Sequence, residues 1–309
     1  MPFCELRLPI DSKTPLETIS KLIISCFDLG YDRIVFCQTE HLKTTASKKN
    51  KNKKRKLDNN DDDDAGGGGG GGSAESTGGW ICPKLIKIQL PDLVLQRCKQ
   101  TKREFKILSR LNVIVYDNQS LHFLKRNDVQ QFDLLSLQPI NRDILLYLLN
   151  SPTIQFEILS LDTTDPNLLP FPSRVIRATA DKGVTYELCY SGALKDPFER
   201  RYFMAFGRHL SNILHGKSLI FSSNATNPIQ LRSPHDMMEI GQLFGLSDEK
   251  SRCIINENPI DVLTRSFNRR KTANGLIWME PVQASTLSLT TESFTSSTLL
   301  LSSTSNTIV

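Results

Sequence analysis

Apolar runs of strand length alternate with helix-like segments along most of the chain. The first run, Phe3 to Ile10, alternates apolar and polar positions as a strand does, and the next segment carries apolar residues on one helical face before Gly30. Further strands are expected at residues 33–38, 106–117, 133–140, 156–163, 185–194 and 218–225. Helices are expected between and after them, at residues 16–29, within 86–105, and at 142–150, 173–182, 197–215, 233–246, 247–256 and 259–268.

This regular alternation predicts the fold class. Strands that alternate with helices are typical of parallel sheets with right-handed crossovers. About seven such units in roughly 245 residues favour an α/β, TIM-barrel-like barrel. An open, doubly wound sheet fits the same pattern and stays open as an alternative.

Two segments depart from the pattern. Residues 44–79 run from a basic block through an acidic one to an unbroken series of glycines, and residues 284–309 are mostly Ser and Thr. Such compositions bury too little apolar surface to offset the entropy of ordering. We therefore expect one barrel domain over residues 1–283 with a disordered insert at 44–79, followed by a disordered tail at 284–309.

The cysteines and the N-terminal residues indicate in which cellular compartment the protein is expected. The seven cysteines are spread along the chain without CxxC spacing, which argues against a zinc ribbon or a disulfide framework. The N-terminal residues lack the form of a signal peptide, and no apolar run approaches the length of a membrane span. A reducing compartment and no membrane partner are expected.

A basic block occupies residues 48–56 and ends in Lys53, Lys54, Arg55 and Lys56. A solvated linker would account for it. A basic block in an exposed, disordered loop is also accessible to an import receptor, so a nuclear localisation signal is the sharper interpretation.

Gly216, Lys217 and Ser218 match the closing half of a phosphate-binding Walker loop. That loop requires a strand, a glycine-rich turn and then a helix. Here the expected helix comes first and the strand second, and the first glycine of the motif is replaced by Ser211. Gly216 is therefore expected to end a helix in a left-handed conformation, and nucleotide binding at this triplet is excluded.

An α/β barrel places catalytic groups at the carboxyl ends of its strands. The candidates there are Asp11, His41, Asp117 and Asp162, and a metal-dependent phosphoesterase using them is the alternative function. A hydrolase of the histidinol-phosphatase kind would carry His-x-His after its first strand, but this chain has Glu5-Leu6-Arg7. Caps and turns account better for the scattered aspartates, so no catalytic residue, metal site or cofactor is assigned.

Basic residues gather in three places. Ordinary solvated faces would explain any one cluster, but three together suggest contact with phosphate backbones or partner proteins. The first cluster also contains Arg97, Lys99 and Arg110, and the third also contains Arg265. The residues assigned to RNA or partner contact are Lys102, Arg103 and Lys106; Lys195, Arg200 and Arg201; and Arg269, Arg270 and Lys271.

A set of short motifs resembles the thirty-kilodalton protein subunit family of nuclear ribonuclease P and ribonuclease MRP. The likeness covers about residues 3–279 outside the insert and is thin between residues 117 and 172. The motifs are Tyr186-Glu187-Leu188 with Tyr190-Ser191, Lys195-Asp196, Arg200-Arg201-Tyr202, the stretch GKSLIFSS from Gly216, Leu243 to Ser247, and Arg270 to Leu276.

The resemblance implies a barrel related to the polymerase-and-histidinol-phosphatase hydrolases but without their metal ligands. It implies a non-catalytic subunit in a complex whose RNA holds the catalytic Mg²⁺ ions and removes the 5′ leader of precursor tRNA. The implied partners are ribonuclease P RNA, MRP RNA, precursor tRNA, a small partner subunit and the other ribonuclease P proteins. The implied location is the nucleus, and within it the nucleolus, with a possible part in rRNA processing.

Overall fold

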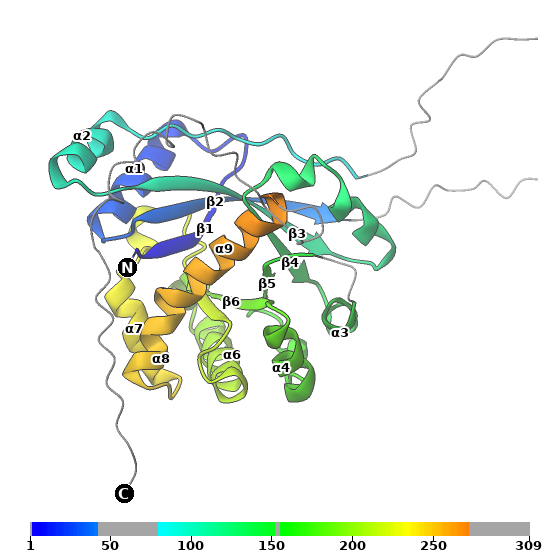
Figure 1. The fold of residues 1–309 in the computed structure, drawn as a ribbon. Coiled ribbons are helices and arrows are strands. Elements are labelled where there is room, and N and C mark those ends of the chain that lie inside the picture. The colour runs from blue at the N-terminus through cyan, green and yellow to red at the C-terminus, as the bar shows by residue number, and fades with distance from the viewer. Residues whose placement is uncertain (1, 43–79, 152–154, 272–309) are drawn as a thin grey trace, which may run out of the picture.

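The structure is a computed structural model that describes residues 2–42, 80–151 and 155–271 (Figure 1). The expected insert, the localisation signal within it and the Ser/Thr-rich tail lie outside these residues. So does most of the motif that begins at Arg270.

Seven parallel strands form one sheet in which each strand pairs with its neighbour in sequence. They are β1 (Cys4–Pro9), β2 (Arg33–Leu42), β3 (Lys106–Val115), β4 (Leu134–Pro139), β5 (Ile158–Ser160), β6 (Thr185–Cys189) and β7 (Leu219–Ser222). All seven coincide with expected strands, because a strand buried on both faces has a strong apolar signal.

The first and last strands approach one another and nearly close the sheet into a barrel. The backbone N–H of Asn224, just after β7, donates to the carbonyl of Arg7 in β1 at 3.0 Å. Beside it, the Glu5 carboxylate accepts from the backbone N–H of Ser223 at 2.9 Å and from that of Arg7 at 3.0 Å. The pairing of β1 with β2 shifts register between Glu5 and Leu8, a bulge that turns Arg7 into the barrel. The expected barrel is confirmed, and the open sheet is wrong.

Helices surround the barrel (Figure 1). They are α1 (Leu16–Asp28), α2 (Asp92–Thr101), α3 (Arg142–Asn150), α4 (Ser173–Asp181), α5 (Ser191–Lys195), α6 (Pro197–Leu214), α7 (Pro234–Leu243), α8 (Asp248–Ile255) and α9 (Glu257–Lys271). Short 3-10 turns lie at Gln119–Lys125, Val129–Gln131, Pro166–Leu168 and Pro228–Gln230. No helix in the described ranges has the length and apolar character that crossing a membrane requires.

Helix starts follow the expected capping chemistry. Ser233 caps α7 and forms a reciprocal capping box with Asp236, and Pro234 occupies the first turn. Asp196 caps α6 by accepting from the backbone N–H groups of Phe198 and Glu199.

Two boundaries differ from the expectation. The strand expected at residues 185–194 ends at Cys189, and the rest forms α5, because the alternation of apolar and polar residues stops there. The left-handed cap of α6 is His215, with φ of 52°, and Gly216 follows it with φ of 84°. The order of helix then strand at Gly216 confirms that the triplet is not a Walker loop.

Helix α9 covers the amino-terminal end of the barrel. Its Val262 is fully buried against an apolar layer inside the barrel. That layer consists of Cys4, Leu6, Val35, Leu134, Ile158 and Ile220. Polar contacts hold α9 at the starts of the strands: Ser266 Oγ donates to the carbonyl of Asp133, and Asn258 Nδ2 donates to that of Leu219 at 2.7 Å. The barrel therefore has a closed, apolar floor.

Candidate functional site

The middle of the barrel interior is charged. Arg110 in β3 donates from Nη1 and Nη2 to the two carboxylate oxygens of Glu187 in β6, and both side chains lie out of solvent. Arg7 in β1 makes a second ion pair with the same carboxylate, at 3.2 Å. Ser222 Oγ donates to Glu187 at 2.6 Å, and Ser136 Oγ accepts from Arg110 Nε at 2.8 Å. Two guanidinium groups thus share one carboxylate in a hydrogen-bonded network.

This network corrects the expected place of Arg110, which the sequence grouped with the basic surface near α2. Arg110 has no exposed surface, because its position in β3 points into the barrel. Burial alone would raise the pKa of Glu187, but Arg110 and Arg7 outweigh it and hold that pKa at about 2. The carboxylate is therefore ionised throughout the physiological range.

Arg7, the last residue of the stretch Glu5-Leu6-Arg7, is thus engaged inside the barrel. The four candidates for a metal site make separate local contacts. Asp11 accepts from Thr14, Asp117 from Ser120 and Asp162 from Thr164, while His41 Nδ1 lies 2.9 Å from Tyr116 Oη. Within the ranges that the structure describes, no group of three or more His, Cys, Asp or Glu side chains could hold a metal ion.

One set of predicted contact residues lies at the carboxyl end of the barrel. Lys195 ends α5 and is exposed, and Arg200 and Arg201 are exposed in the first turns of α6. Arg200 Nε donates to the carbonyl of Ala193 at 2.8 Å, which fixes its side chain against α5. Arg201 lies over the ring of Phe198, itself 66% exposed, at 5.6 Å. This mouth set presents cations and an exposed aromatic ring together.

A second set lies at the opposite, amino-terminal end. Arg270 pairs with Asp133 at 2.6 Å and keeps 30% of its side chain exposed, and Lys271 is exposed with its ammonium 5.3 Å from the Phe267 ring centroid. Lys102 is exposed at the end of α2, and Lys106 is exposed at the start of β3, where it pairs with Glu104 at 2.7 Å. We call these four residues the floor set.

Two predicted contact residues are engaged within the protein. Arg269 has a side chain only 6% exposed, and it pairs with Glu157 at 2.5 Å and with the Gln130 side chain. Arg103 pairs with Asp32 at 2.6 Å and donates to the carbonyl groups of Tyr31 and Phe27. Their guanidinium groups anchor α9 and the end of α2, and contact of these two residues with RNA or a partner stays a prediction.

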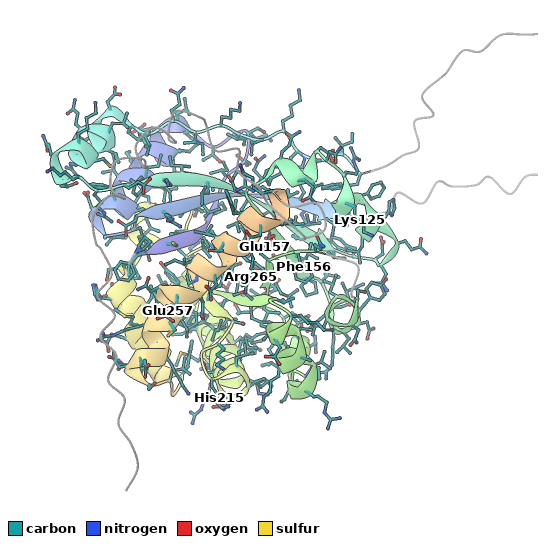
Figure 2. The ribbon with its side chains drawn as sticks, viewed as in Figure 1. Lys125, Phe156, Glu157, His215, Glu257 and Arg265 are labelled. Carbon is teal, nitrogen blue, oxygen red and sulfur yellow. The ribbon has the colours of Figure 1, made fainter. Side chains whose placement is uncertain are left out.

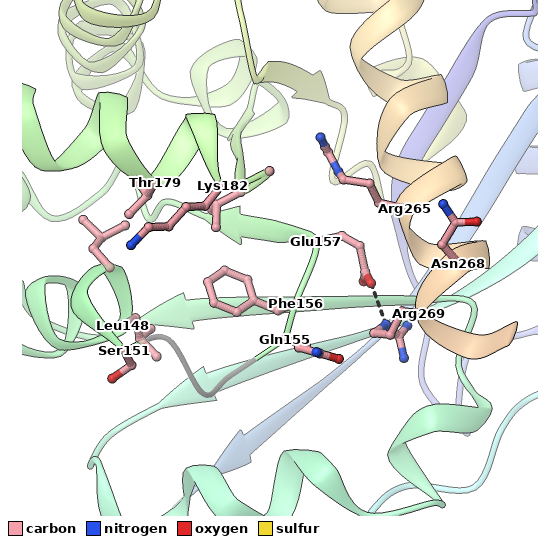
Figure 3. Close-up of a pocket in the computed structure, with 13 residues that line it drawn as sticks. Leu148, Ser151, Gln155, Phe156, Glu157, Thr179, Lys182, Arg265, Asn268 and Arg269 are labelled. Carbon is pink, nitrogen blue, oxygen red and sulfur yellow. Dashed lines mark hydrogen bonds and ion pairs between the residues drawn. The ribbon is translucent and has the colours of Figure 1, made fainter. Parts of the chain in front are cut away.

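A cavity of about 490 Å³ opens beside α9, between α3 and α4 (Figure 3). Phe156, Glu157 and Arg265 lie together at this place (Figure 2). Lys182 and Arg269 add positive charge to its walls, and the pair of Arg269 with Glu157 crosses one side. Burial lowers the pKa of Arg265, whose Nη2 donates to Thr185 Oγ1 at 2.6 Å. Lys182 and Phe156 could not be identified as lining residues from the sequence, because the other residues around the cavity come from separate segments.

Known proteins similar to the chain agree with the motifs. A sequence model of the family described as RNase P subunit p30 matches residues 2–271. Mouse ribonuclease P protein subunit p30 is 29% identical over 177 residues, which are 57% of this chain and 65% of the mouse protein. Ribonuclease P protein subunit drpp30 of Dictyostelium discoideum is 27% identical over 55% of this chain and 46% of its own length. The chain thus spans less than two thirds of the length of these two relatives.

A solved structure shares the fold. A chain from the cryo-EM structure of archaeal ribonuclease P with mature tRNA superposes with a TM-score of 0.53 at 12% identity, covering 91% of this chain and all of the other. The match over residues 2–271 includes every strand of the barrel and all of α9. The chain therefore belongs to the RNase P subunit p30 family.

Proposed function

We propose that the protein is a non-catalytic subunit of the ribonuclease P ribonucleoprotein, which supports removal of the 5′ leader from precursor tRNA. The family match over residues 2–271 carries this proposal. The carboxyl end of the barrel supports it, because Asp11, His41, Asp117 and Asp162 each make a separate local contact there. In this proposal the RNA subunit binds the catalytic Mg²⁺ ions and performs the cleavage.

The proposal extends to partners and location. The partners are ribonuclease P RNA, MRP RNA, precursor tRNA, a small partner subunit and other ribonuclease P proteins, with rRNA processing as a second role. The protein acts in the nucleus, within the nucleolus, and residues 53–56 serve as the import signal.

The contact residues divide between two ends of the barrel. We assign RNA or partner contact to the mouth set of Lys195, Arg200 and Arg201, and to the floor set of Lys102, Lys106, Arg270 and Lys271. The two sets lie at opposite ends of the parallel strands. A complex that uses both therefore has one partner that extends along the barrel, or two partners that bind at separate ends.

Native purification tests the proposal. The tagged full-length protein is isolated from its own cells, the co-purifying RNA is sequenced, and the eluate is assayed for precursor tRNA cleavage before and after micrococcal nuclease. Ribonuclease P or MRP RNA in the eluate, with cleavage lost after nuclease, is the expected result. Absence of such RNA, with cleavage that survives nuclease and stops with a chelator, would overturn it in favour of a phosphoesterase.

A further inference from the structure

The charged interior of the barrel is not balanced. Arg7 and Arg110 bring two positive charges, and Glu187 brings one negative charge. Among the described residues, no second carboxylate forms an ion pair with either arginine. Glu5 is nearby in sequence, but its carboxylate accepts backbone N–H groups instead, and burial raises its pKa to about 7. Burying an uncompensated charge is costly, so this interior favours an additional anion.

Arg7 has a hydrogen-bond donor, its Nε–H group, that the described residues leave without an acceptor. Its side chain is 8% exposed, and its Nη groups contact Ser160, Glu187 and Gln138. Its Nε is buried, and no acceptor for it exists in the described parts of the chain. A buried guanidinium N–H without an acceptor is rare in folded proteins, because the lost hydrogen bond to water is not replaced.

A cavity of about 240 Å³ leads to Arg7 from the carboxyl end of the barrel. Lys195 stands on its wall with a flexible ammonium group, and the hydroxyl-bearing residues Thr163, Thr164 and Ser191 line it as well. The cavity thus brings together the buried cation Arg7, the exposed cation Lys195 and several polar side chains. Its volume is sufficient for a small tetrahedral anion and the chemical group attached to it.

Two carboxylates also line this cavity and restrict which anion fits. Asp162 accepts hydrogen bonds from the backbone N–H and the hydroxyl of Thr164. A carboxylate oxygen of Glu199 lies against Gly192, only 1.8 Å from the point that a Cβ on Gly192 would occupy. A carboxylate only accepts hydrogen bonds when ionised. An anion that binds beside it is favoured when it carries a proton of its own. Inorganic phosphate does so near neutral pH and sulfate does not, while a phosphomonoester, whose second pKa is about 6, does so only in its singly ionised fraction.

We propose that the carboxyl-end cavity is a phosphate-binding site, in which Arg7 and Lys195 hold a terminal phosphate group whose P–OH faces Asp162 or Glu199. The site binds either inorganic phosphate or the terminal phosphate of a nucleotide. It goes beyond the proposed role in the ribonucleoprotein, and the isolated chain is sufficient to test it.

Calorimetric titration of the purified full-length protein provides the test. Inorganic phosphate, a ribonucleoside 5′-monophosphate, the corresponding nucleoside and sulfate are each titrated at one ionic strength set with chloride. Saturable binding of one or both phosphate compounds, at least about tenfold tighter than sulfate or the nucleoside, is expected. Preference for the monophosphate identifies a nucleotide end as the natural ligand, and preference for inorganic phosphate identifies the free ion.

Variants locate the binding. Lys195→Ala should weaken phosphate binding about tenfold, whereas Lys21→Ala, which removes an exposed lysine from α1, should leave it unchanged. Arg7→Lys keeps the charge and removes the guanidinium group that lines the cavity, and it should weaken binding further in protein whose circular dichroism is unchanged. If Arg7→Lys does not fold, the affinity of Lys195→Ala for phosphate still tests whether the cavity is the binding site.

Equal affinity for phosphate and sulfate would mean a general charge effect and would overturn the proposal. So would phosphate binding that Lys195→Ala leaves intact, or the absence of saturable binding. None of these results bears on whether ribonuclease P RNA co-purifies with the protein, so the two proposals can fail separately.

Discussion

Arg110 and Glu187 face one another across the barrel interior, from strands β3 and β6, and are joined by two parallel hydrogen bonds of 2.5 and 2.6 Å. The two residues are 77 positions apart, and neither has any exposed surface. The pair links strands that have no backbone hydrogen bonds with each other. It therefore fixes the interior of the barrel as well as its charge.

Breaking this pair from one side should destabilise the barrel strongly. Glu187→Gln leaves two buried guanidinium groups without a counter-charge, and we expect a loss of about 3–5 kcal/mol in the free energy of unfolding, measured by urea denaturation. Arg110→Met should cost less than Glu187→Gln, because Arg7 still neutralises the carboxylate. A smaller loss for Glu187→Gln than for Arg110→Met would contradict this account of the charges.

Glu5 should make stability fall as pH rises towards neutrality. Burial is the main reason that the pKa of Glu5 lies near 7 in the folded protein, above its ordinary value of 4.5. The folded state then binds more protons than the unfolded state between these values, so the contribution of Glu5 is complete below pH 4.5 and is lost as pH rises through about 7, on the order of 3 kcal/mol.

Glu5→Gln should remove this dependence while Gln still accepts the N–H of Ser223. The free energy of unfolding of both proteins is measured between pH 5 and 8, where Glu187 does not titrate. The wild-type curve should decline relative to the Glu5→Gln curve. Parallel curves would show that Glu5 is ionised in the folded protein at all these pH values.

Gly207 permits the close packing of α6 against Phe244. A Cβ on Gly207 would lie 2.3 Å from ring atoms of Phe244, whose side chain is buried. Gly207→Ala should therefore cost about 1–3 kcal/mol, measured as a lower midpoint of urea unfolding. Phe244→Leu should lower the free energy of unfolding less in the Gly207→Ala protein than in the wild type, because the smaller Leu side chain makes room for the new Cβ at position 207. If the losses in the free energy of unfolding from the two substitutions were additive, direct packing of Gly207 against Phe244 would be contradicted. Met204→Ala, at a partly exposed position of the same helix, is the control substitution.

Charge reversal distinguishes the two ends of the barrel. The mouth variant carries Lys195→Glu, Arg200→Glu and Arg201→Glu, and the floor variant carries Lys102→Glu, Arg270→Glu and Lys271→Glu. At least one should lower the co-purified RNA and precursor tRNA processing about tenfold, because each lost cation weakens phosphate contact.

A control variant with the same change in charge carries Lys21→Glu, Arg174→Glu and Lys217→Glu at exposed positions outside both sets. Melting temperatures of all three proteins are compared first, so that assembly is judged only for folded protein. Full assembly and processing by both the mouth and the floor variants would contradict the assignment of these residues.

The order of strands and helices was predictable from the sequence, because apolar runs and caps are local signals. Ser233 is an example, since its capping box lies within four residues. The charged interior was not predictable, because the partner of Arg110 lies on a distant strand. One signal was available: Arg7, Arg110 and Glu187 each interrupt an apolar strand, and a charge at such a position must find a partner in the core.

The contact residues show the same limit. Exposed Arg201 and buried Arg269 have similar sequence surroundings, each beside another arginine in a helix. What separates them is Glu157, which lies 112 positions from Arg269 and meets it only because α9 crosses the start of β5. A basic cluster in sequence therefore does not reveal which of its members are free to bind a partner.

The position of α9 has a consequence for synthesis of the protein. Each strand pairs with the strand made just before it, so the barrel wall can assemble as the chain leaves the ribosome. Its floor cannot, because α9 is the last of the described elements. Until residues 257–271 emerge, the apolar layer around Leu6 and Ile220 stays open to water. The nascent chain then exposes an apolar surface to which chaperones can bind and through which chains can aggregate. A chain terminated before Glu257 would keep that surface permanently.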